Sequence, residues 1–398
     1  MRIVGLSIAV VLGAAVTAAP EDAPAAASPI VVAVDGNDSA AGTLDRPLRT
    51  IQEAVDRAGP GDVIAVRGGT YALVDNITIT TSGEASEPIS LGAYQGEEVV
   101  IDGEALPASH TPVGGGIPRA ERGAIHQEAS HWRVSDLEII NGPYGYYCDS
   151  CDSNVFSRLT TRDNYETGFQ LQGDSSGNQI LDLDSFGNRD PRKSGESADG
   201  LGIKEGSGAG NVVRGVRLWN NVDDGFDAWK FASPVLIEDT VAHGNGVDRW
   251  DFPDFAGDGN GFKLGGGTPA PPAGHTVRNS VAFDNAKHGF TDNGNTGTLT
   301  LSGNSTFSNS GTGFDADTAG ARAGLTANLA VSDGRPASRG ADTASSGNSW
   351  DIGGTWNDAS VMSTDTDAVT APRGTDGSLP WAPAFLVPRN GAPVGARL

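Results

Sequence analysis

Six segments of the chain share one eleven-residue pattern, and this pattern decides the fold. They read NVFSRLTTRDN (154–164), NQILDLDSFGN (178–188), NVVRGVRLWNN (211–221), VLIEDTVAHGN (235–245), HTVRNSVAFDN (275–285) and LTLSGNSTFSN (299–309). Each segment ends on an asparagine, and copies without an insertion follow one another after 24 residues. A strand–turn unit of this length cannot bury its own apolar face, so the copies must stack on one another.

A glycine followed by a large apolar residue comes after each segment. These pairs are Gly168-Phe169, Gly200-Leu201, Gly225-Phe226, Gly261-Phe262, Gly289-Phe290 and Gly313-Phe314. The repeated asparagine suits a ladder of stacked amides inside a turn, each bonded to the next coil. The leucine spacing of leucine-rich repeats is absent, and propeller blades are longer. We therefore predict an all-β chain folded as a right-handed parallel β-helix.

The region before the repeat has the pattern of an N-terminal cap that covers the first coil of a β-helix. A strand at 30–34 precedes an amphipathic helix at 48–58, and short strands follow at 62–66, 77–81, 89–94 and 99–103. A helix of this kind shields the open edge of the first coil. We expect an N-terminal cap with the first coils at 30–105, the β-helix core with its cleft at 106–320, and C-terminal loops and extended chain at 321–398. Within the last region, 319–346 is low in apolar residues and is expected to be loop.

Composition narrows the classes of partner. The 398 residues carry a formal net charge of −23, which argues against nucleic acid and against anionic membrane surfaces as partners.

Residues 1–19 have the charge, apolar run and small residues of a secretory signal peptide, with an uncertain cleavage position. We expect a secreted monomer. Cys148 and Cys151, in CDSC, are expected to form a local disulfide rather than a redox or zinc site.

Two copies of the repeat carry insertions at the same corner. One spans 189–198 and the other 246–259, on either side of an uninterrupted coil that contains DDGFD at 223–227. We expect the insertions to form two walls of a cleft with that coil as its floor. The second wall carries Arg249 and three aromatic residues: Trp250, Phe252 and Phe255.

Aligning the coils on the glycine brings acidic residues together. Asp199, Asp224, Asn260 and His288 share the position before the glycine, and Gly202, Asp227, Lys263 and Thr291 share the position three later. Neighbouring coils lie about 4.8 Å apart. Asp223 stands beside Asp224. Clustered carboxylates repel one another unless a cation lies among them, and all-oxygen ligation is typical of calcium. We predict a Ca²⁺ site formed by Asp199, Asp223, Asp224 and Asp227, although a lone DDGFD would also suit a solvated turn.

Lys263 occupies the position equivalent to Asp227 in the next coil. An ion pair with Asp227 on the surface is the ordinary fate of such a lysine. If Ca²⁺ holds the aspartates instead, the lysine faces positive charge, its pKa falls, and it can act as a base. Candidate ligands for substrate carboxylates are Lys204, Arg249, Lys287 and His288.

At these positions the chain resembles the family 9 polysaccharide lyases, the calcium-dependent pectate lyase type. The motifs that match are DGLGIK (199–204), NNVDDGFDAW (220–229), GDGNGFKLGG (257–266) and NSVAFDNAKHGFTDN (279–293), and the likeness covers roughly residues 30–390. The resemblance implies that the four aspartates bind Ca²⁺ and that Lys263 is the base. It also implies β-elimination on a 4-linked uronate polymer such as pectate.

Two other functions compete with this interpretation. A β-helical glycoside hydrolase of the polygalacturonase type also uses paired carboxylates, but its NTD, GHG and RIK signatures are absent. A non-catalytic carbohydrate-binding β-helix would not depend on Lys263. A lyase forms a product that absorbs ultraviolet light, which separates it from both alternatives.

Overall fold

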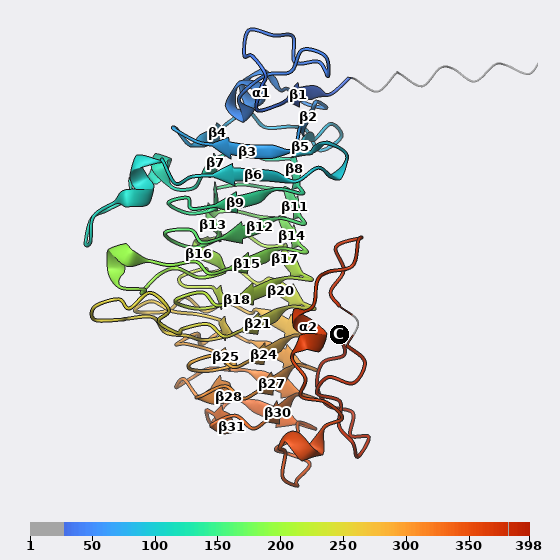
Figure 1. Cartoon of the computed structure of the whole chain (residues 1–398). Helices are drawn as coiled ribbons and strands as arrows, with labels where there is room; N and C mark the ends of the chain where they lie inside the picture. The colour runs from blue at the N-terminus through green and yellow to red at the C-terminus, as the bar shows by residue number, and fades with distance from the viewer. Residues whose placement is uncertain (1–27, 381) are drawn as a thin grey trace, which may run out of the picture.

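Three parallel sheets wind around one apolar core in the computed structural model, which describes residues 28–380 and 382–398 (Figure 1). Each strand pairs in parallel with the strand one coil away. The fold is therefore a parallel β-helix, as the repeat predicts. The expected signal peptide at 1–19 lies outside the described residues.

Each coil contributes one strand to each sheet in the repeat region. The first sheet contains β1 (Ile30–Val32), β2 (Val63–Val66), β5 (Ile89–Ala93), β8 (Trp132–Ser135), β11 (Val155–Ser157), β14 (Gln179–Leu181), β17 (Asn211–Arg214), β20 (Val235–Glu238), β23 (Thr276–Arg278), β26 (Thr300–Ser302), β29 (Gly324–Thr326) and β32 (Ala344–Ser346). The second sheet contains β4 (Ile77–Ile79), β7 (Ile125–Gln127), β10 (Tyr146–Asp149), β13 (Phe169–Asp174), β16 (Leu201–Ser207), β19 (Phe226–Asp227), β22 (Phe262–Lys263), β25 (Phe290–Thr291), β28 (Thr312–Ala316) and β31 (Arg335–Arg339). The third sheet contains β3 (Gly69–Ala72), β6 (Val99–Asp102), β9 (Glu138–Ile140), β12 (Thr160–Arg162), β15 (Asp184–Phe186), β18 (Arg217–Trp219), β21 (Val241–His243), β24 (Val281–Phe283), β27 (Ser305–Phe307) and β30 (Leu329–Val331).

The repeated asparagines form the predicted ladder at the corner between the third and second sheets. Asn188 Nδ2 donates to Asn221 Oδ1 at 2.8 Å, and Asn221 Nδ2 donates to Asn245 Oδ1 at 3.0 Å. The ladder begins at Asn164 and continues through Asn285 and Asn309 to Asp333. Two further ladders occupy the other corners: Asn154, Asn178 and Asn211, and then Asn304, Asn328 and Asn348.

The glycine after each ladder position is required by the close approach of the next coil. A Cβ atom at Gly225 would lie 2.6 Å from the carbonyl oxygen of Gly261 and 3.0 Å from Asn245 Nδ2. The apolar residue that follows, Phe226, is fully buried in the core. Ladder and glycine together therefore set the register of the second sheet.

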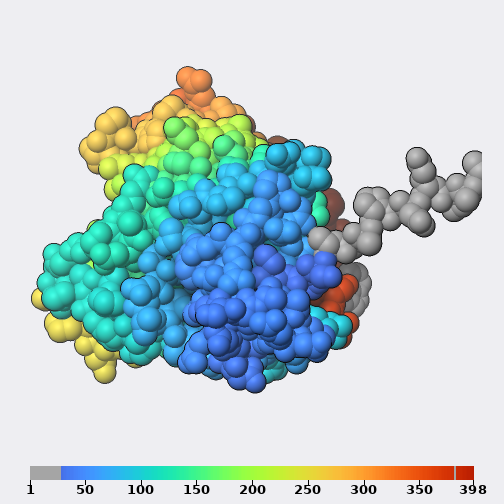
Figure 2. All heavy atoms as spheres, turned by 90° about the horizontal axis from the view of Figure 1, so that it is seen from above, coloured from blue at the N-terminus to red at the C-terminus, as the bar shows by residue number. Residues whose placement is uncertain are grey.

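The predicted N-terminal helix forms as α1 (Ile51–Arg57). Thr50 caps it by accepting a hydrogen bond from Glu53 N at 3.2 Å, and Ile51, Ala54 and Val55 are buried. Seen from above, the N-terminal residues cover this end of the molecule (Figure 2). The helix thus protects the first coil, as expected.

The coils continue further than the sequence period indicates. The expectation of loop at 319–346 is wrong, because β29, β30, β31 and β32 lie there and pair in register with the preceding coil. β29 and β30 still bury Leu325, Leu329 and Val331, whereas β31 and β32 carry polar and small residues, such as RPASR at 335–339, and lack the apolar alternation of earlier copies. Backbone pairing with the coil before them compensates for this.

The C-terminal segment runs back along the outside of the third sheet (Figure 1). It includes Asp358–Ser360, a 3₁₀ turn, and α2 (Asp367–Thr370). Val369, Phe385 and Leu386 pack there with Phe283 and Val331. The segment therefore covers the outer apolar side chains of several coils.

Three long loops leave the same corner, between the third and second sheets. They span 103–124, 187–200 and 244–261, and they project from one side of the molecule (Figure 1). The first holds the 3₁₀ turns Pro107–His110 and Arg119–Glu121, and the second holds Pro191–Lys193. A further 3₁₀ turn is Tyr94–Gly96. The sequence repeat predicts the second and third loops but misses the first.

Cys148 and Cys151 form the expected local disulfide, with their Cα atoms 5.9 Å apart. Among the residues that the structure describes, none of the helices has the length and apolar character needed to span a bilayer.

Candidate active site

Asp199, Asp224 and Asn260, which precede the repeated glycine in three consecutive coils, stack on one another as predicted. Asp224 N donates to Asp199 Oδ1 at 3.3 Å, and Asn260 donates to Asp224 Oδ1 through both its backbone N (2.7 Å) and its Nδ2 (2.8 Å). The column three residues later is also in register, since Gly202 pairs with Asp227, Asp227 with Lys263, and Lys263 with Thr291. The repeat therefore brings the aspartates and the lysine of three coils together.

The carboxylates form two overlapping clusters. Oxygen atoms of Asp199, Asp224 and Asp227 lie within 4.8 Å of one another, and so do oxygen atoms of Asp223, Asp224 and Asp258. Asp199 and Asp224 are fully buried, and Asp223 and Asp227 are 2% exposed. Burial of this much negative charge requires compensation by cations.

Two lysines supply part of that compensation. Lys204 on β16 pairs with Asp199 and with Asp227, the latter at 2.8 Å. Lys263 Nζ on β22 lies 2.9 Å from Asp224 Oδ2, 3.1 Å from Asp258 Oδ2 and 3.7 Å from Asp227 Oδ2. Asp258 also pairs with Lys287 at 2.9 Å.

The charge count leaves room for a divalent cation. Lys204 and Lys263 neutralise two of the four carboxylates of Asp199, Asp223, Asp224 and Asp227, while Asp258 is matched by Lys287. Two negative charges remain. Asp224 Oδ2 is buried, and its charged neighbour is the ammonium of Lys263 at 2.9 Å, so a cation at this oxygen would compete with the lysine. An all-oxygen set with this charge fits Ca²⁺ better than zinc, which prefers nitrogen and sulfur ligands.

The buried charges perturb one another's proton affinities. Burial raises the pKa of Asp199 to about 7, although Lys204 opposes the shift. Burial and then the charge of Asp224 raise the pKa of Asp223. Burial alone would lower the pKa of Lys263, but the carboxylates of Asp224 and Asp227 outweigh it and raise the pKa. Lys263 therefore keeps its proton while those carboxylates pair with it.

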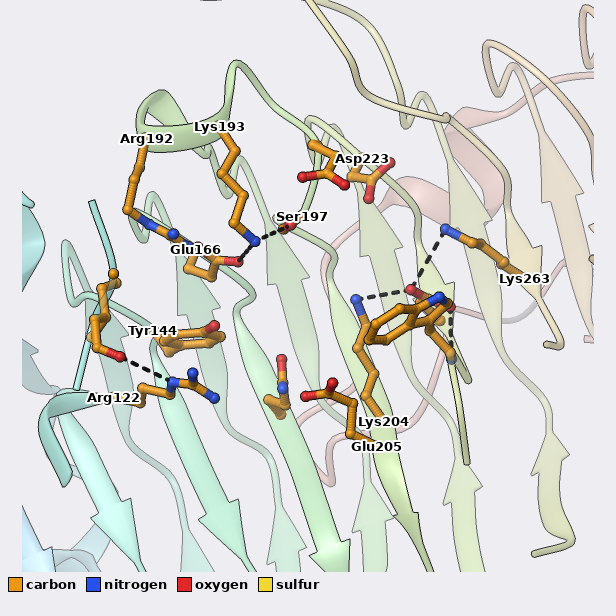
Figure 3. Close-up of a pocket in the computed structure, with 16 residues that line it drawn as sticks. Arg122, Tyr144, Glu166, Arg192, Lys193, Ser197, Lys204, Glu205, Asp223 and Lys263 are labelled. Atoms are coloured by element: carbon orange, nitrogen blue, oxygen red, sulfur yellow. Dashed lines mark hydrogen bonds and ion pairs between the residues drawn. The ribbon is translucent and has the colours of Figure 1, made fainter. Parts of the chain in front are cut away.

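A cavity of about 460 Å³ opens over this cluster (Figure 3). Asp223, Asp227, Lys204 and Lys263 line one part of it. Residues from the loops at 103–124 and 187–200 and from neighbouring coils line the rest: Gly116, Ile117, Arg122, Tyr144, Glu166, Gln170, Arg192, Lys193, Glu196, Ser197, Glu205 and Trp229. The charged cluster is thus open to a ligand at one end of a polar cavity.

The two predicted walls do not face each other across the cleft. Ala256 N of the loop at 244–261 donates to Ser194 O of the loop at 187–200 at 3.0 Å, and the ring of Phe255 lies beside Gly195. The two loops therefore join into one wall. The loop at 103–124 completes it, because Gly114 N donates to Arg192 O at 2.9 Å. The expectation of opposing walls is wrong because loop contacts, unlike coil register, do not follow from the repeat.

The four candidates for substrate binding lie in different surroundings. Lys204 lines the cavity and is held by two aspartates. Lys287 reaches the site through Asp258. Arg249 lies outside the cavity lining and donates to Asn220 Oδ1 at 2.8 Å. His288 Nδ1 accepts a hydrogen bond from Thr312 N at 3.0 Å, and the ring is also outside the lining.

Several residues in the cavity or beside its charged cluster have no role in the sequence prediction. Asp258 lies in GDGNGFK, and its acidic character next to the column was a usable signal. Arg192 and Lys193 lie in an insertion already expected at the cleft. Arg122 and Tyr144 lie before Asn154, where the recognisable repeat begins, so the alignment of the copies does not predict their positions.

Comparison with known proteins agrees with the fold and the motifs. A family model of the Pel9A-like right-handed β-helix region matches residues 30–330, which confirms the handedness. Pectate lyase PEL9 of Emericella nidulans is 51% identical over 390 residues, covering 93% of this chain and 94% of that protein. Pectate lyase L of Dickeya chrysanthemi is 31% identical over 372 residues, covering 92% and 85%.

A solved structure gives the same result. The crystal structure of pectate lyase Pel9A is similar with a TM-score of 0.76 and 29% identity, and the match covers 90% of this chain and 89% of that chain. The chain belongs to the Pel9A-like right-handed β-helix family and is a polysaccharide lyase of the pectate lyase type.

Proposed function

We propose that this protein cleaves a pectate-like, 4-linked uronate polymer by β-elimination, with Lys263 as the base and Ca²⁺ bound by Asp199, Asp223, Asp224 and Asp227. The observation that carries the proposal is the lysine amine 2.9 Å from a cluster of buried carboxylates whose charge the protein does not fully compensate. The relatives named as pectate lyases support this choice of substrate class.

The cation and the lysine have separate tasks. Bound by the aspartates, Ca²⁺ would attract the substrate's carboxylate and stabilise the charge that develops beside it. The aspartates hold the site rigidly because they sit on consecutive coils. With these carboxylates engaged elsewhere, Lys263 loses the partners that raise its pKa and can release its proton.

The bonds then change in a simple order. Neutral Lys263 Nζ removes the proton from C5 of the uronate. The electron pair of that C–H bond forms the C4–C5 double bond, and the C4–O4 bond breaks. The released O4 takes up a proton from water, and the ammonium of Lys263 returns its proton to solvent, which leaves an unsaturated uronate at the new end.

The setting of the enzyme is part of the same proposal. The pattern at 1–19 supports secretion, and a disulfide between Cys148 and Cys151 suits an oxidising compartment. α1 packs against β1, β2 and β4, which disfavours edge-to-edge association at that end and supports a monomer.

Lys263→Ala is the direct test. We expect it to abolish formation of ultraviolet-absorbing product from polygalacturonate while the chain stays folded in Ca²⁺; without the cation the variant should be less stable than the wild type, because Lys263 pairs with the buried Asp224. A chelator should also abolish activity of the wild type, and added Ca²⁺ should restore it. Cleavage without ultraviolet absorbance would show hydrolysis, and binding without any cleavage would show a carbohydrate-binding protein.

A further inference from the structure

Arg122 differs from the other cations of the cavity because it has no carboxylate partner among the described residues. Arg192 pairs with Glu166, and Lys204 pairs with two aspartates. The ion pairs between described side chains do not include Arg122, although its side chain is only half-exposed. A partly buried guanidinium without an anion is a site that favours one.

The side chain is held in place by neutral groups. Arg122 Nη1 donates to the Tyr147 hydroxyl at 3.1 Å, Nε donates to Ile117 O at 3.4 Å, and the guanidinium carbon lies 5.7 Å from the centre of the Tyr147 ring. Tyr147 is itself buried and donates to Gln172 Oε1 at 2.7 Å. These hydrogen bonds use the N–H of Nε and one N–H of Nη1, and they leave the second N–H of Nη1 and both N–H groups of Nη2 for a ligand.

Arg122 lies at the opposite part of the cavity from the aspartates (Figure 3). It precedes β7, whereas Lys204 is on β16, and β10 and β13 lie between these strands in the second sheet. Three strand spacings amount to about 14 Å, which is the length of an oligosaccharide rather than of one sugar ring. The ring of Tyr144 lines the same part of the cavity and offers an apolar surface beside the guanidinium.

We propose that Arg122 binds the carboxylate of a second uronate residue, several positions along the polymer from the residue that loses its C5 proton. The inference rests on the proposed function for the identity of the polymer. A guanidinium with free N–H groups matches a carboxylate in a bidentate manner. Arg122 therefore selects for chains in which uronates recur, and it acts on binding rather than on the elimination step.

The experiment measures equilibrium binding of oligogalacturonates, from dimers to hexamers, to a Lys263→Ala background in the presence of Ca²⁺. Adding Arg122→Gln should weaken binding of the longer oligomers by about tenfold or more, which is typical of a lost hydrogen bond to a charged group. Binding of the dimer should not change, because it cannot span both sites. Arg122→Lys should give an intermediate affinity for the longer oligomers, since it keeps the charge but loses the fork.

Arg133→Gln is the matched control, because Arg133 is exposed on β8 in the first sheet. It should leave every affinity unchanged. Equal weakening for dimer and hexamer, or no weakening in Arg122→Gln, would overturn the proposal. If the wild type forms no unsaturated product but Arg122→Gln still loses affinity for longer oligomers, the proposed reaction fails and the binding site stands.

Discussion

Residues of the loop at 187–200, together with Glu166 between β12 and β13, show how much charge the protein buries around its cavity. Glu166 is 2% exposed and pairs with Arg192. Asp190, at the start of the 3₁₀ turn, is fully buried. Its Oδ1 accepts from Lys193 N at 3.2 Å, whereas Oδ2 has no hydrogen-bond partner among the described residues. This carboxyl group is therefore more easily buried with its proton on.

The free energy of unfolding should depend on pH through Asp190. Burial, followed by the charge of Glu166, raises the pKa of Asp190 to about 7. Because the folded pKa exceeds the unfolded one, the folded state is favoured below about pH 4, and this advantage is lost as pH rises through about 7. Asp190→Asn should remove that loss and gain about 1–3 kcal/mol over the wild type at pH 8.

Urea unfolding at pH 4.5 and pH 8 checks this prediction. The two proteins should be similar at the lower pH. Asp251→Asn, in an exposed position of the loop at 244–261, serves as the control and should follow the wild type. A constant difference between Asp190→Asn and the wild type at both pH values would contradict the assigned proton.

At the scale of elements, the asparagine ladder explains why three irregular loops can leave one corner without disturbing the coils. The spacing between ladder residues is 24 between Asn164 and Asn188, 33 between Asn188 and Asn221, and 40 between Asn245 and Asn285, yet the hydrogen bonds are alike. Each amide satisfies backbone and side-chain groups of the next coil whatever the length of chain between them. The ladder thus keeps Asp199, Asp224 and Lys263 in register.

Removal of one ladder residue should therefore cost stability. Asn221→Ala leaves the Nδ2 and backbone N of Asn188 without their buried acceptor. We expect a loss of about 1–3 kcal/mol in the free energy of unfolding, the usual cost of an unsatisfied buried donor. Asn390→Ala, at an exposed position of the C-terminal segment, should change it by less than about 0.5 kcal/mol. Equal effects of the two substitutions, measured by denaturant unfolding, would show that the ladder is dispensable.

For the whole molecule, cation binding should be visible in stability as well as in activity. A ligand that binds only the folded state at a concentration one hundred times its dissociation constant stabilises that state by about 2.7 kcal/mol. Ca²⁺ should stabilise the wild type in this way, and Mg²⁺ less so because it dehydrates reluctantly. Asp224→Asn should lose most of the effect, since Asp224 belongs to both carboxylate clusters.

Thermal unfolding with and without Ca²⁺ tests this at the level of the intact protein. Asp254→Asn provides the comparison, because Asp254 is exposed and outside both clusters. It should respond to Ca²⁺ as the wild type does. A response that is the same in Asp224→Asn would place the cation elsewhere on this acidic molecule.

The sequence by itself determined the β-helix, its capping helix, the asparagine ladder and the shared register of Asp224, Asp227 and Lys263. It could do so because stacking of equivalent coils is a local and repeated rule, so a position in one copy predicts its neighbour in the next. β31 and β32 escaped prediction because backbone pairing, not apolar alternation, specifies them, whereas Leu325, Leu329 and Val331 of β29 and β30 were a usable signal.

Only the tertiary structure decided how the loops meet and what surrounds each charge. The loops at 103–124, 187–200 and 244–261 have no common period, so their joining into one wall depends on contacts between distant segments. The same contacts bring Asp258 to Lys263 and Arg122 into the cavity of the aspartates. Burial and ion pairing depend on such contacts, and they decide which of the charged residues can bind a ligand.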